Sequence, residues 1–216
     1  MTSRAVPFGP ASIFRCGALA LLVELESLEA VIALRLHLDR SPIDGVVEMV
    51  SAFRTLLVRY DPIVVTEQRL RQLLVQAVPV DEPVGTTSAD IVEISVIYDG
   101  EDLESVATIT GLGVAGVIRE HTGQVWTSAF CGFSPGFSYL VAPSWRLEVA
   151  RRASSRTIVP AGSVALAGGF SGVYPRSSPG GWQLIGRTEA RMWSLDRLPP
   201  ALAPAGTLVR FVDAGH

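Results

Sequence analysis

Residues 159–188 hold the densest group of side chains in this chain that could bind a ligand. Seven glycines lie there among short apolar runs, a pattern typical of short β-strands joined by tight turns. Polar groups stand between them, including the hydroxyls of Ser163 and Tyr174 and the guanidinium of Arg187. Glycine backbones can approach a ligand closely and offer it their N–H groups. The segment therefore predicts the rim of a β-barrel with a binding site, or else a β structure whose glycines are purely structural.

Positive charge gathers in the same part of the chain. Residues 124–188 contain six arginines and one acid, Glu148, although the whole chain has a net charge of −3. The guanidinium fork matches the geometry of carboxylates and phosphates, so one hypothesis is an anion site. Arg156 and Arg187 are its first candidates and Arg176 is the third. A solvated basic face is the alternative.

A paired acid and base is missing from this stretch. Hydrolysis by general acid–base catalysis usually needs two titratable groups, and residues 124–188 offer Glu148 and no histidine. His121 lies just before the stretch, on the apolar face of a helix predicted over residues 114–122. It is either a core histidine or a catalytic group acting nearly alone. The pattern predicts an incomplete active site to which another polypeptide contributes.

Two short motifs suggest chemistry that their context excludes. Gly111, Gly113 and Gly116 form a G-x-G-x-x-G, but a helix rather than a strand is predicted before it, and no acid follows at the required distance. Ser134 stands in a G-x-S-x-G, but the next residue is Pro135, which lacks the N–H that an oxyanion hole needs. We therefore expect neither a dinucleotide site nor a serine hydrolase.

Composition narrows the function classes further. The chain has 216 residues and a mean hydropathy of +0.35, but glycines and prolines interrupt its long uncharged runs, so we expect no membrane span and a cytoplasmic location. The near-balanced charge argues against nucleic acid and membrane partners. All 18 basic residues are arginine, which excludes lysine-dependent chemistry. The two cysteines, Cys16 and Cys131, are expected to be buried free thiols, with no metal site.

Hydrophobic periodicity predicts an α+β chain with two domains. Strands are expected at residues 12–15, 19–24, 46–50, 55–60 and 91–97, and helices at 28–39, 67–78, 102–108 and 114–122. A segment rich in proline and small polar residues, 79–89, is the predicted boundary. We expect a small α/β domain over residues 1–89 and a β-rich domain over residues 90–216.

Three motifs in order, GFSPGFSYL at Gly132–Leu140, VPAGSV from Val159 and GVYPRSSPGGWQLIGRT up to Thr188, resemble the family of 5-oxoprolinase B subunits, KipI and allophanate hydrolase subunit 1. Weaker likeness extends to both ends of the chain. One departure stands out, because the family usually has Gln-Thr-Gly where this chain has Phe170, Ser171 and Gly172.

The resemblance implies a small N-terminal α/β sandwich followed by a cyclophilin-like β-barrel. It also implies a cytoplasmic hetero-oligomer in which this chain, a half of a carboxyltransferase domain, shares an active site with a C subunit, and for 5-oxoprolinase also with an A subunit. Together they would hydrolyse 5-oxoproline to glutamate with ATP as co-substrate and no metal or organic cofactor in this chain; the chain alone would be inactive. The alternatives are a KipI-like inhibitor of a sensor histidine kinase and an allophanate hydrolase-type subunit that acts on another small amide.

On this resemblance the motif residues become candidates for the site. The candidate catalytic residues are His121, Ser163 and Arg187. The candidates for binding substrate or nucleotide are Phe133, Pro135, Gly136, Tyr139, Arg156, Pro160, Gly162, Gly172, Tyr174, Pro175, Ser178, Gly180, Gly181, Trp182 and Thr188.

Overall fold

The computed structural model describes residues 12–77 and 91–215. The chain divides into two compact units, Met1–Thr87 and Ser88–His216. The boundary expected at residue 89, and the segment 79–89 around it, lie outside the described residues.

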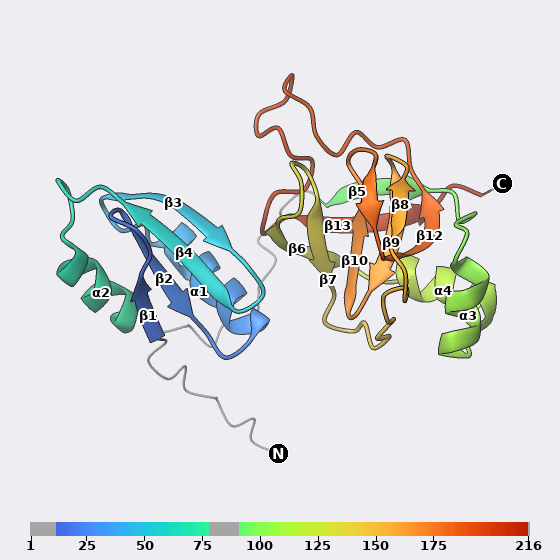
Figure 1. Cartoon of the computed structure of the whole chain (residues 1–216), viewed down its shortest axis with the longest axis horizontal. Coiled ribbons are helices and arrows are strands. Elements are labelled where there is room, and N and C mark those ends of the chain that lie inside the picture. Colours follow the sequence, from blue (N-terminus) through green and yellow to red (C-terminus); the bar gives the residue numbers. More distant parts are fainter. Residues whose placement is uncertain (1–11, 78–90, 216) are drawn as a thin grey trace, which may run out of the picture. The chain divides into compact units, whose positions relative to one another are not determined.

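The N-terminal unit is a four-stranded antiparallel sheet with two helices (Figure 1). Its strands lie in the order β1 (Ser12–Arg15), β2 (Ala20–Glu24), β4 (Thr55–Tyr60) and β3 (Val46–Ser51). Helix α1 (Leu28–Arg40) and helix α2 (Glu67–Gln76) both contribute to one apolar core with the sheet. Ser27 caps α1 by accepting a hydrogen bond from the Ala30 N–H at 3.3 Å, and Thr66 caps α2 in the same way.

The C-terminal unit is built around a seven-stranded sheet. In spatial order its strands are β12 (Gln183–Arg187), β9 (Ser163–Ala167), β10 (Phe170–Val173), β7 (Ser138–Val141), β6 (Trp126–Cys131), β13 (Leu208–Asp213) and β5 (Val92–Val96). All neighbours are antiparallel except β13 and β5. A two-stranded sheet of β8 (Arg156–Val159) and β11 (Ser178–Gly180) is formed by the segments that flank β9 and β10 in the chain.

The sheet closes into a barrel where its first and last strands meet. The Ile97 N–H donates to the Arg187 carbonyl at 2.9 Å, and the Arg187 N–H donates to the Ile97 carbonyl at 2.8 Å. Gly186 makes this approach possible, because a Cβ there would lie 2.5 Å from the Ile97 carbonyl oxygen.

Helices α3 (Leu103–Thr110) and α4 (Gly113–Thr122) pack together and cover part of the barrel (Figure 1). Their apolar residues share a core with Trp126, Phe211 and Ile94, which are fully or almost fully buried. Strand β9 is buried along its whole length on both faces: Val164 and Leu166 face this core, whereas Ala165 and Ala167 face a second one. The second core supports the candidate site described below.

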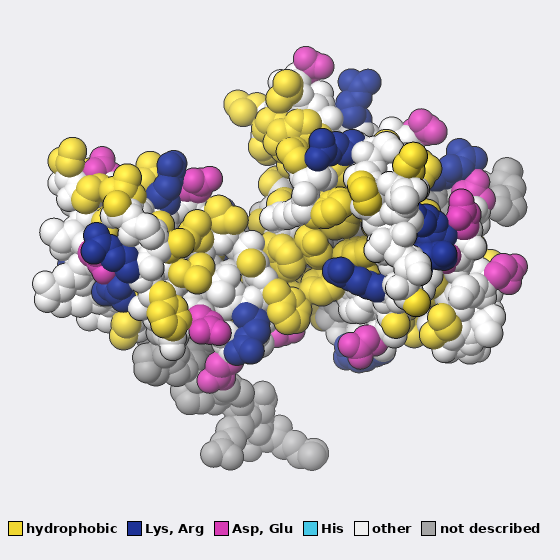
Figure 2. Space-filling view, in the orientation of Figure 1, with side chains coloured by type: hydrophobic (Ala, Val, Ile, Leu, Met, Phe, Trp, Pro, Cys, Tyr) yellow, Lys and Arg dark blue, Asp and Glu magenta, His cyan; other side chains and the backbone are white. Residues whose placement is uncertain are grey.

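The loop between β12 and β13 extends away from the barrel, and hydrophobic side chains gather over it (Figures 1 and 2). The side chains of Leu195 and Leu198 are 83% and 95% exposed. The loop is nevertheless held in place, because the Ser194 N–H and the Arg197 guanidinium both donate to the Pro200 carbonyl.

The α+β fold class with a β-barrel in the C-terminal half is confirmed. The expectation of buried thiols is wrong for Cys16, which is exposed in the turn between β1 and β2, and Cys131 is half-buried. Within residues 12–77 and 91–215, no helix is long and apolar enough to cross a membrane.

Candidate functional site

An aromatic hollow of about 240 Å³ lies over the second core of the C-terminal unit. It brings together six of the predicted binding residues with four others. The lining consists of Phe133, Phe137, Tyr139, Arg151, Ser155, Tyr174, Pro179, Gly180, Gly181 and Trp182.

The walls of this aromatic hollow are aromatic rings that pack against one another edge-to-face. Phe137 is at the centre, with ring centroids 5.1 Å from Tyr139, 5.4 Å from Tyr174 and 5.3 Å from Trp182, all close to perpendicular. Edge-to-face pairs at these distances are favourable beyond the area they bury. The aromatic hollow is therefore preformed, because the packing of these rings fixes its walls.

Phe133 stands at the rim in an unusual backbone conformation. Its φ is +65°, the sole positive value of a residue other than glycine among those described. A turn holds it there, since the Gly132 N–H donates to the Phe137 carbonyl at 3.1 Å and the Phe137 N–H to the Ser134 carbonyl at 3.0 Å. Phe133 is 58% exposed, and its ring lies nearly perpendicular to those of Phe137 and Tyr174. Strain of this kind is often kept at sites that bind ligands.

The polar side chains of the aromatic hollow can all donate hydrogen bonds. Arg151 is exposed at its edge, and burial raises the pKa of Tyr174 despite opposing effects of the Trp182 backbone and Arg151, so the phenol keeps its proton at neutral pH. Gly180 leaves room for the Tyr174 hydroxyl, with which a Cβ would overlap. The arrangement suits a small, partly apolar ligand with an anionic group.

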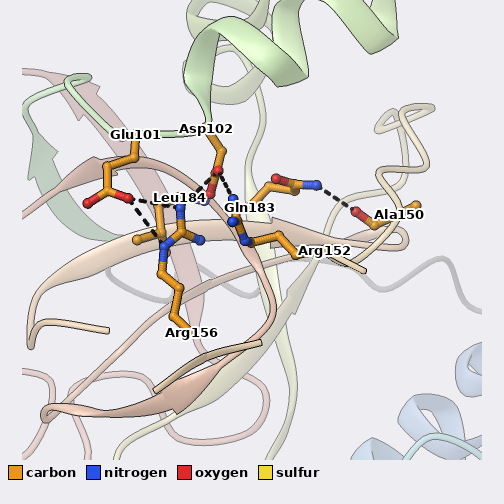
Figure 3. Close-up of polar contacts among 7 residues, drawn as sticks. All are labelled: Glu101, Asp102, Ala150, Arg152, Arg156, Gln183 and Leu184. Carbon is orange, nitrogen blue, oxygen red and sulfur yellow. Dashed lines mark hydrogen bonds and ion pairs between the residues drawn. The ribbon is translucent and has the colours of Figure 1, made fainter. Parts of the chain in front are cut away.

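Arg156 lies outside this lining, in a cluster that joins three elements (Figure 3). Its Nη2 donates to Glu101 at 3.0 Å and to Asp102 at 2.9 Å, and Asp102 also accepts hydrogen bonds from Arg152 and from the Leu184 N–H. Burial alone would raise the pKa of Asp102, but the hydrogen bonds from Arg156 and Leu184 hold that pKa below its ordinary value. The guanidinium of Arg156 thus already has two carboxylate partners.

Arg187 and Thr188 line a different hollow, of about 290 Å³, on the outer face of the barrel. The Arg187 Nε donates to Asp99 at 2.8 Å. The two arginines first chosen as anion ligands are therefore paired with carboxylates, and neither lines the aromatic hollow.

His121 is completely buried in α4. Its Nδ1 is 2.7 Å from the Tyr98 hydroxyl and its Nε2 is 2.8 Å from the Ser171 hydroxyl, and it stacks on Phe211. Burial lowers the pKa of His121 to about 3. His121 therefore has no accessible ring atom for the predicted catalytic role, because both ring nitrogens are enclosed by the core.

The remaining predicted residues support the backbone around the aromatic hollow. Ser163 is buried and donates to the Pro160 carbonyl at 2.8 Å, so its hydroxyl is used within its own turn. Gly162 allows close contact with the Thr188 carbonyl, and Gly172 lies under the Phe137 and Trp182 rings.

The other predicted residues lie in turns or pair with neighbouring strands. Pro135 is exposed, and Gly136, which has a φ of +84°, packs against Trp193. Pro175 follows the buried Tyr174 in the chain, and Ser178 pairs with Val159.

Across most of its length the chain matches a known family model. The model is described as carboxyltransferase domain, subdomain C and D, and matches residues 11–203. The chain belongs to this carboxyltransferase-domain family. The resemblance drawn from the three motifs is thereby confirmed.

Similar proteins agree with this family. The chain is 38% identical over 189 residues to the B subunit of 5-oxoprolinase from Bacillus subtilis, covering 82% of this chain and 79% of that protein. It is 44% identical over 124 residues to the B subunit of 5-oxoprolinase from Escherichia coli O157:H7, covering 56% and 57%. The crystal structure of TTHA0988 matches with 35% identity and a TM-score of 0.70 over 91% of this chain, but the chain spans 40% of that longer protein.

Phe170, the position at which the resemblance predicts a departure from the family pattern, lies in an aromatic cluster. Its ring meets Phe130 and Tyr139 edge-on, with centroids 6.0 and 5.6 Å away. Phe170 therefore packs against Tyr139, which lines the aromatic hollow.

Sequence reasoning missed four lining residues: Phe137, Arg151, Ser155 and Pro179. A signal existed for Phe137, because it alternates with Tyr139 as residues on one face of a strand do. No signal separated Arg151 from its neighbours, since four arginines lie within residues 146–156. Among the described residues no group of three or more His, Cys, Asp or Glu side chains is placed to hold a metal ion.

Proposed function

We propose that this chain is the B subunit of a multi-subunit, ATP-dependent 5-oxoprolinase, and that the aromatic hollow binds 5-oxoproline in an active site shared with a C subunit. The observation that carries the proposal is the lining itself: donors and aromatic walls without an aspartate, glutamate or histidine. The relatives from Bacillus subtilis and Escherichia coli are B subunits of 5-oxoprolinase, which favours this substrate over other amides.

The chemistry of lactam cleavage explains why a second polypeptide is needed. Hydrolysis adds water across the ring C–N bond, so a base must take a proton from the water and the ring nitrogen must gain one. None of the lining side chains is a base at neutral pH, so the group that takes the proton from water must come from elsewhere. The lining residues can hold the substrate: Arg151 pairs with its carboxylate, and the rings contact the apolar edge of the lactam.

The surface of the chain is compatible with a role inside a larger complex. Large apolar side chains that stay exposed on an ordered loop are typical of surfaces that another polypeptide covers. The loop between β12 and β13 presents Leu195 and Leu198 in this way. We expect the C subunit to contact this loop.

Reconstitution tests the proposal. We would measure ATP-dependent glutamate release from 5-oxoproline by this chain alone, with a C subunit of the family, and with the A and C subunits together. Release only in the full mixture supports a shared site. No release from an assembly whose subunits demonstrably associate would refute 5-oxoproline as substrate.

Substitution of Arg151 tests the place of the substrate. In the assembled complex, Arg151→Ala should raise KM for 5-oxoproline by roughly 10- to 100-fold, because a charge-assisted hydrogen bond contributes about 1.5–3 kcal/mol. Arg119→Ala is the matched control, since Arg119 is also exposed and lies on α4 outside the hollow. Equal KM values for the two variants would place the carboxylate elsewhere.

A second candidate is a related small amide such as allophanate. The observation that favours it is Phe170, which makes the surroundings of Tyr139 more apolar than the family's glutamine would. Phe170→Gln separates the two candidates: a gain in activity on 5-oxoproline would indicate that the phenyl ring adapts the site to another substrate.

A further inference from the structure

The hollow that contains Arg187 begins where the barrel closure ends. Among the described residues, the ends of β5 and β12 are joined only through Ile97 and Arg187, and β12 ends at Arg187. Thr188 directs its N–H to the opposite side, where it donates to the Gly162 carbonyl at 2.9 Å, and no described residue after Arg187 pairs its backbone with β5. The hollow is also lined by Glu93, Ser95, Glu189 and Ala190. We call this opening the β5 slot.

One edge of β5 is free along the β5 slot. In a strand, alternate residues direct their N–H and C=O groups to the same side. Ile97 directs both groups toward Arg187, so Ser95 and Glu93 direct theirs to the same side, into the slot. Val96 faces the other way and accepts from the Ala214 N–H. Within the part of the chain that the structure describes, no backbone pairing from β5 toward residues 189–190 continues past Ile97.

The charge at the β5 slot is negative. Glu189 is exposed and makes no ion pair with any residue that the structure describes, and Glu93 has only a 3.6 Å contact with Arg210. The one cation in the lining, Arg187, is already paired with Asp99.

We propose that the β5 slot binds an extended peptide segment of another polypeptide by strand addition, with a basic side chain of that segment paired to Glu189. Ser95 and Glu93 supply the backbone donors and acceptors, which recognise an extended main chain whatever its sequence. Glu189 and Glu93 supply the preference for a basic residue. The β5 slot shares no lining residue with the aromatic hollow, so the inference stands apart from the proposed function.

Defined peptides test the proposal on the full chain. The probe is the pentapeptide Thr-Val-Arg-Val-Thr with an acetylated N-terminus and an amidated C-terminus. Its binding is detected by NMR of the protein's backbone amides and by their hydrogen exchange. We expect protection of the Ser95 and Glu93 amides and shifts at Glu189. Replacing the arginine of the peptide by glutamate should weaken binding about tenfold. The idea is overturned if about 1 mM of the basic peptide leaves the amides of Glu93 and Ser95 unprotected.

Two controls separate main-chain recognition from charge attraction. Peptides N-methylated at one or the other set of alternate residues keep the side chains but lose backbone donors, and one of the two must bind at least about tenfold more weakly. Equal binding of both would rule out strand addition. On the protein, Glu189→Arg should reverse the preference to the acidic peptide, whereas Glu120→Arg, a charge reversal on exposed α4, should leave it unchanged.

Discussion

Phe133 keeps a left-handed backbone conformation that glycine would adopt at lower free energy, and it leaves most of its ring exposed. Burial explains little of this choice, since Phe133 is 58% exposed and keeps only edge contacts with Phe137 and Tyr174. Its position at the rim of the aromatic hollow explains it, because the turn places the ring where it can contact a bound ligand.

The strain at Phe133 predicts an order of stability. Phe133→Gly should be more stable than Phe133→Ala by about 1 kcal/mol, because alanine has a Cβ that opposes a φ of +65° and glycine does not. Urea denaturation measures the difference. Phe14 on strand β1 is a matched control, since it is similarly exposed but has no positive φ, and there glycine should be the less stable. Equal stability of the two Phe133 variants would contradict the strain.

The buried His121 predicts how stability depends on pH. Its pKa is about 3 in the folded chain and about 6.5 when unfolded, so between these values the unfolded state binds more protons and stability falls as the pH falls. The free-energy difference between the unmodified chain and His121→Gln should therefore shrink by about 2 kcal/mol from pH 6.5 to pH 4.5. Chemical denaturation at the two pH values checks this; an unchanged difference would mean that His121 is protonated in the fold.

At the scale of elements, Asp102 fastens the start of α3 to the strands beside the aromatic hollow (Figure 3). It is 4% exposed and accepts hydrogen bonds from β8 through Arg156 and from β12 through the Leu184 N–H. Glu101 shares Arg156 but its side chain is 76% exposed. The two neighbouring carboxylates thus differ in burial while they pair with the same guanidinium.

This difference predicts unequal effects of two similar substitutions. Asp102→Asn should destabilise the chain by about 3 kcal/mol, because it leaves buried donors with a weaker partner, whereas Glu101→Gln should cost less than about 1 kcal/mol. Because its folded pKa is lowered, the contribution of Asp102 is present above the unfolded pKa of about 3.9 and is lost as the pH falls through the folded value. Denaturation at neutral pH and in acid measures both effects. Similar losses for the two variants would show that burial of Asp102 is not what matters.

Closure of the barrel depends on the close approach of β12 to Ile97. Gly186→Ala should cost about 2 kcal/mol or more, because the new Cβ would lie 2.5 Å from a backbone oxygen that holds the closure. Gly169→Ala is the control, since a Cβ there meets nothing within 4 Å, and it should stay within about 0.5 kcal/mol of the unmodified chain. Thermal unfolding distinguishes the two. If both variants melt alike, the closure is softer than the structure indicates.

The elements themselves could be predicted from the sequence because their signals are local. Apolar periodicity set α1 and α2 to within a few residues. Closure of the barrel could not be predicted, since it joins Ile97 to Arg187 across most of the domain. The pairing of Asp102 with Arg156 was missed for the same reason, and with it the fact that Arg156 already pairs with two carboxylates.

The sequence indicated which segments lie together better than it indicated what each of their residues does. Residues 133–139 and 174–182, which the motifs placed in one candidate site, both contribute to the lining of the aromatic hollow. The roles depended on which groups are buried or paired, which a single sequence does not show. His121 illustrates this, since its helical face indicated burial but not that Tyr98 and Ser171 occupy both ring nitrogens.

At the scale of the molecule, each unit has a core of its own. One apolar cluster is drawn entirely from residues 21–74, and the other two are drawn entirely from residues 94–211. The aromatic hollow and the β5 slot are both lined only by residues of the C-terminal unit. A unit with its own core can in principle fold alone.

The separate cores predict that a fragment of residues 88–216 folds and keeps both hollows. Its barrel closes through Ile97 and Arg187, and its apolar clusters take no residue from the N-terminal unit, so the dispersed amide spectrum of this part of the chain should be retained. We would compare two-dimensional NMR spectra and thermal unfolding of the fragment with those of the whole chain. Gly186→Ala should lower the melting temperature of the fragment, as we expect it to do in the whole chain. A fragment that loses side-chain dispersion would show that the barrel depends on the N-terminal unit for its stability, despite its separate core.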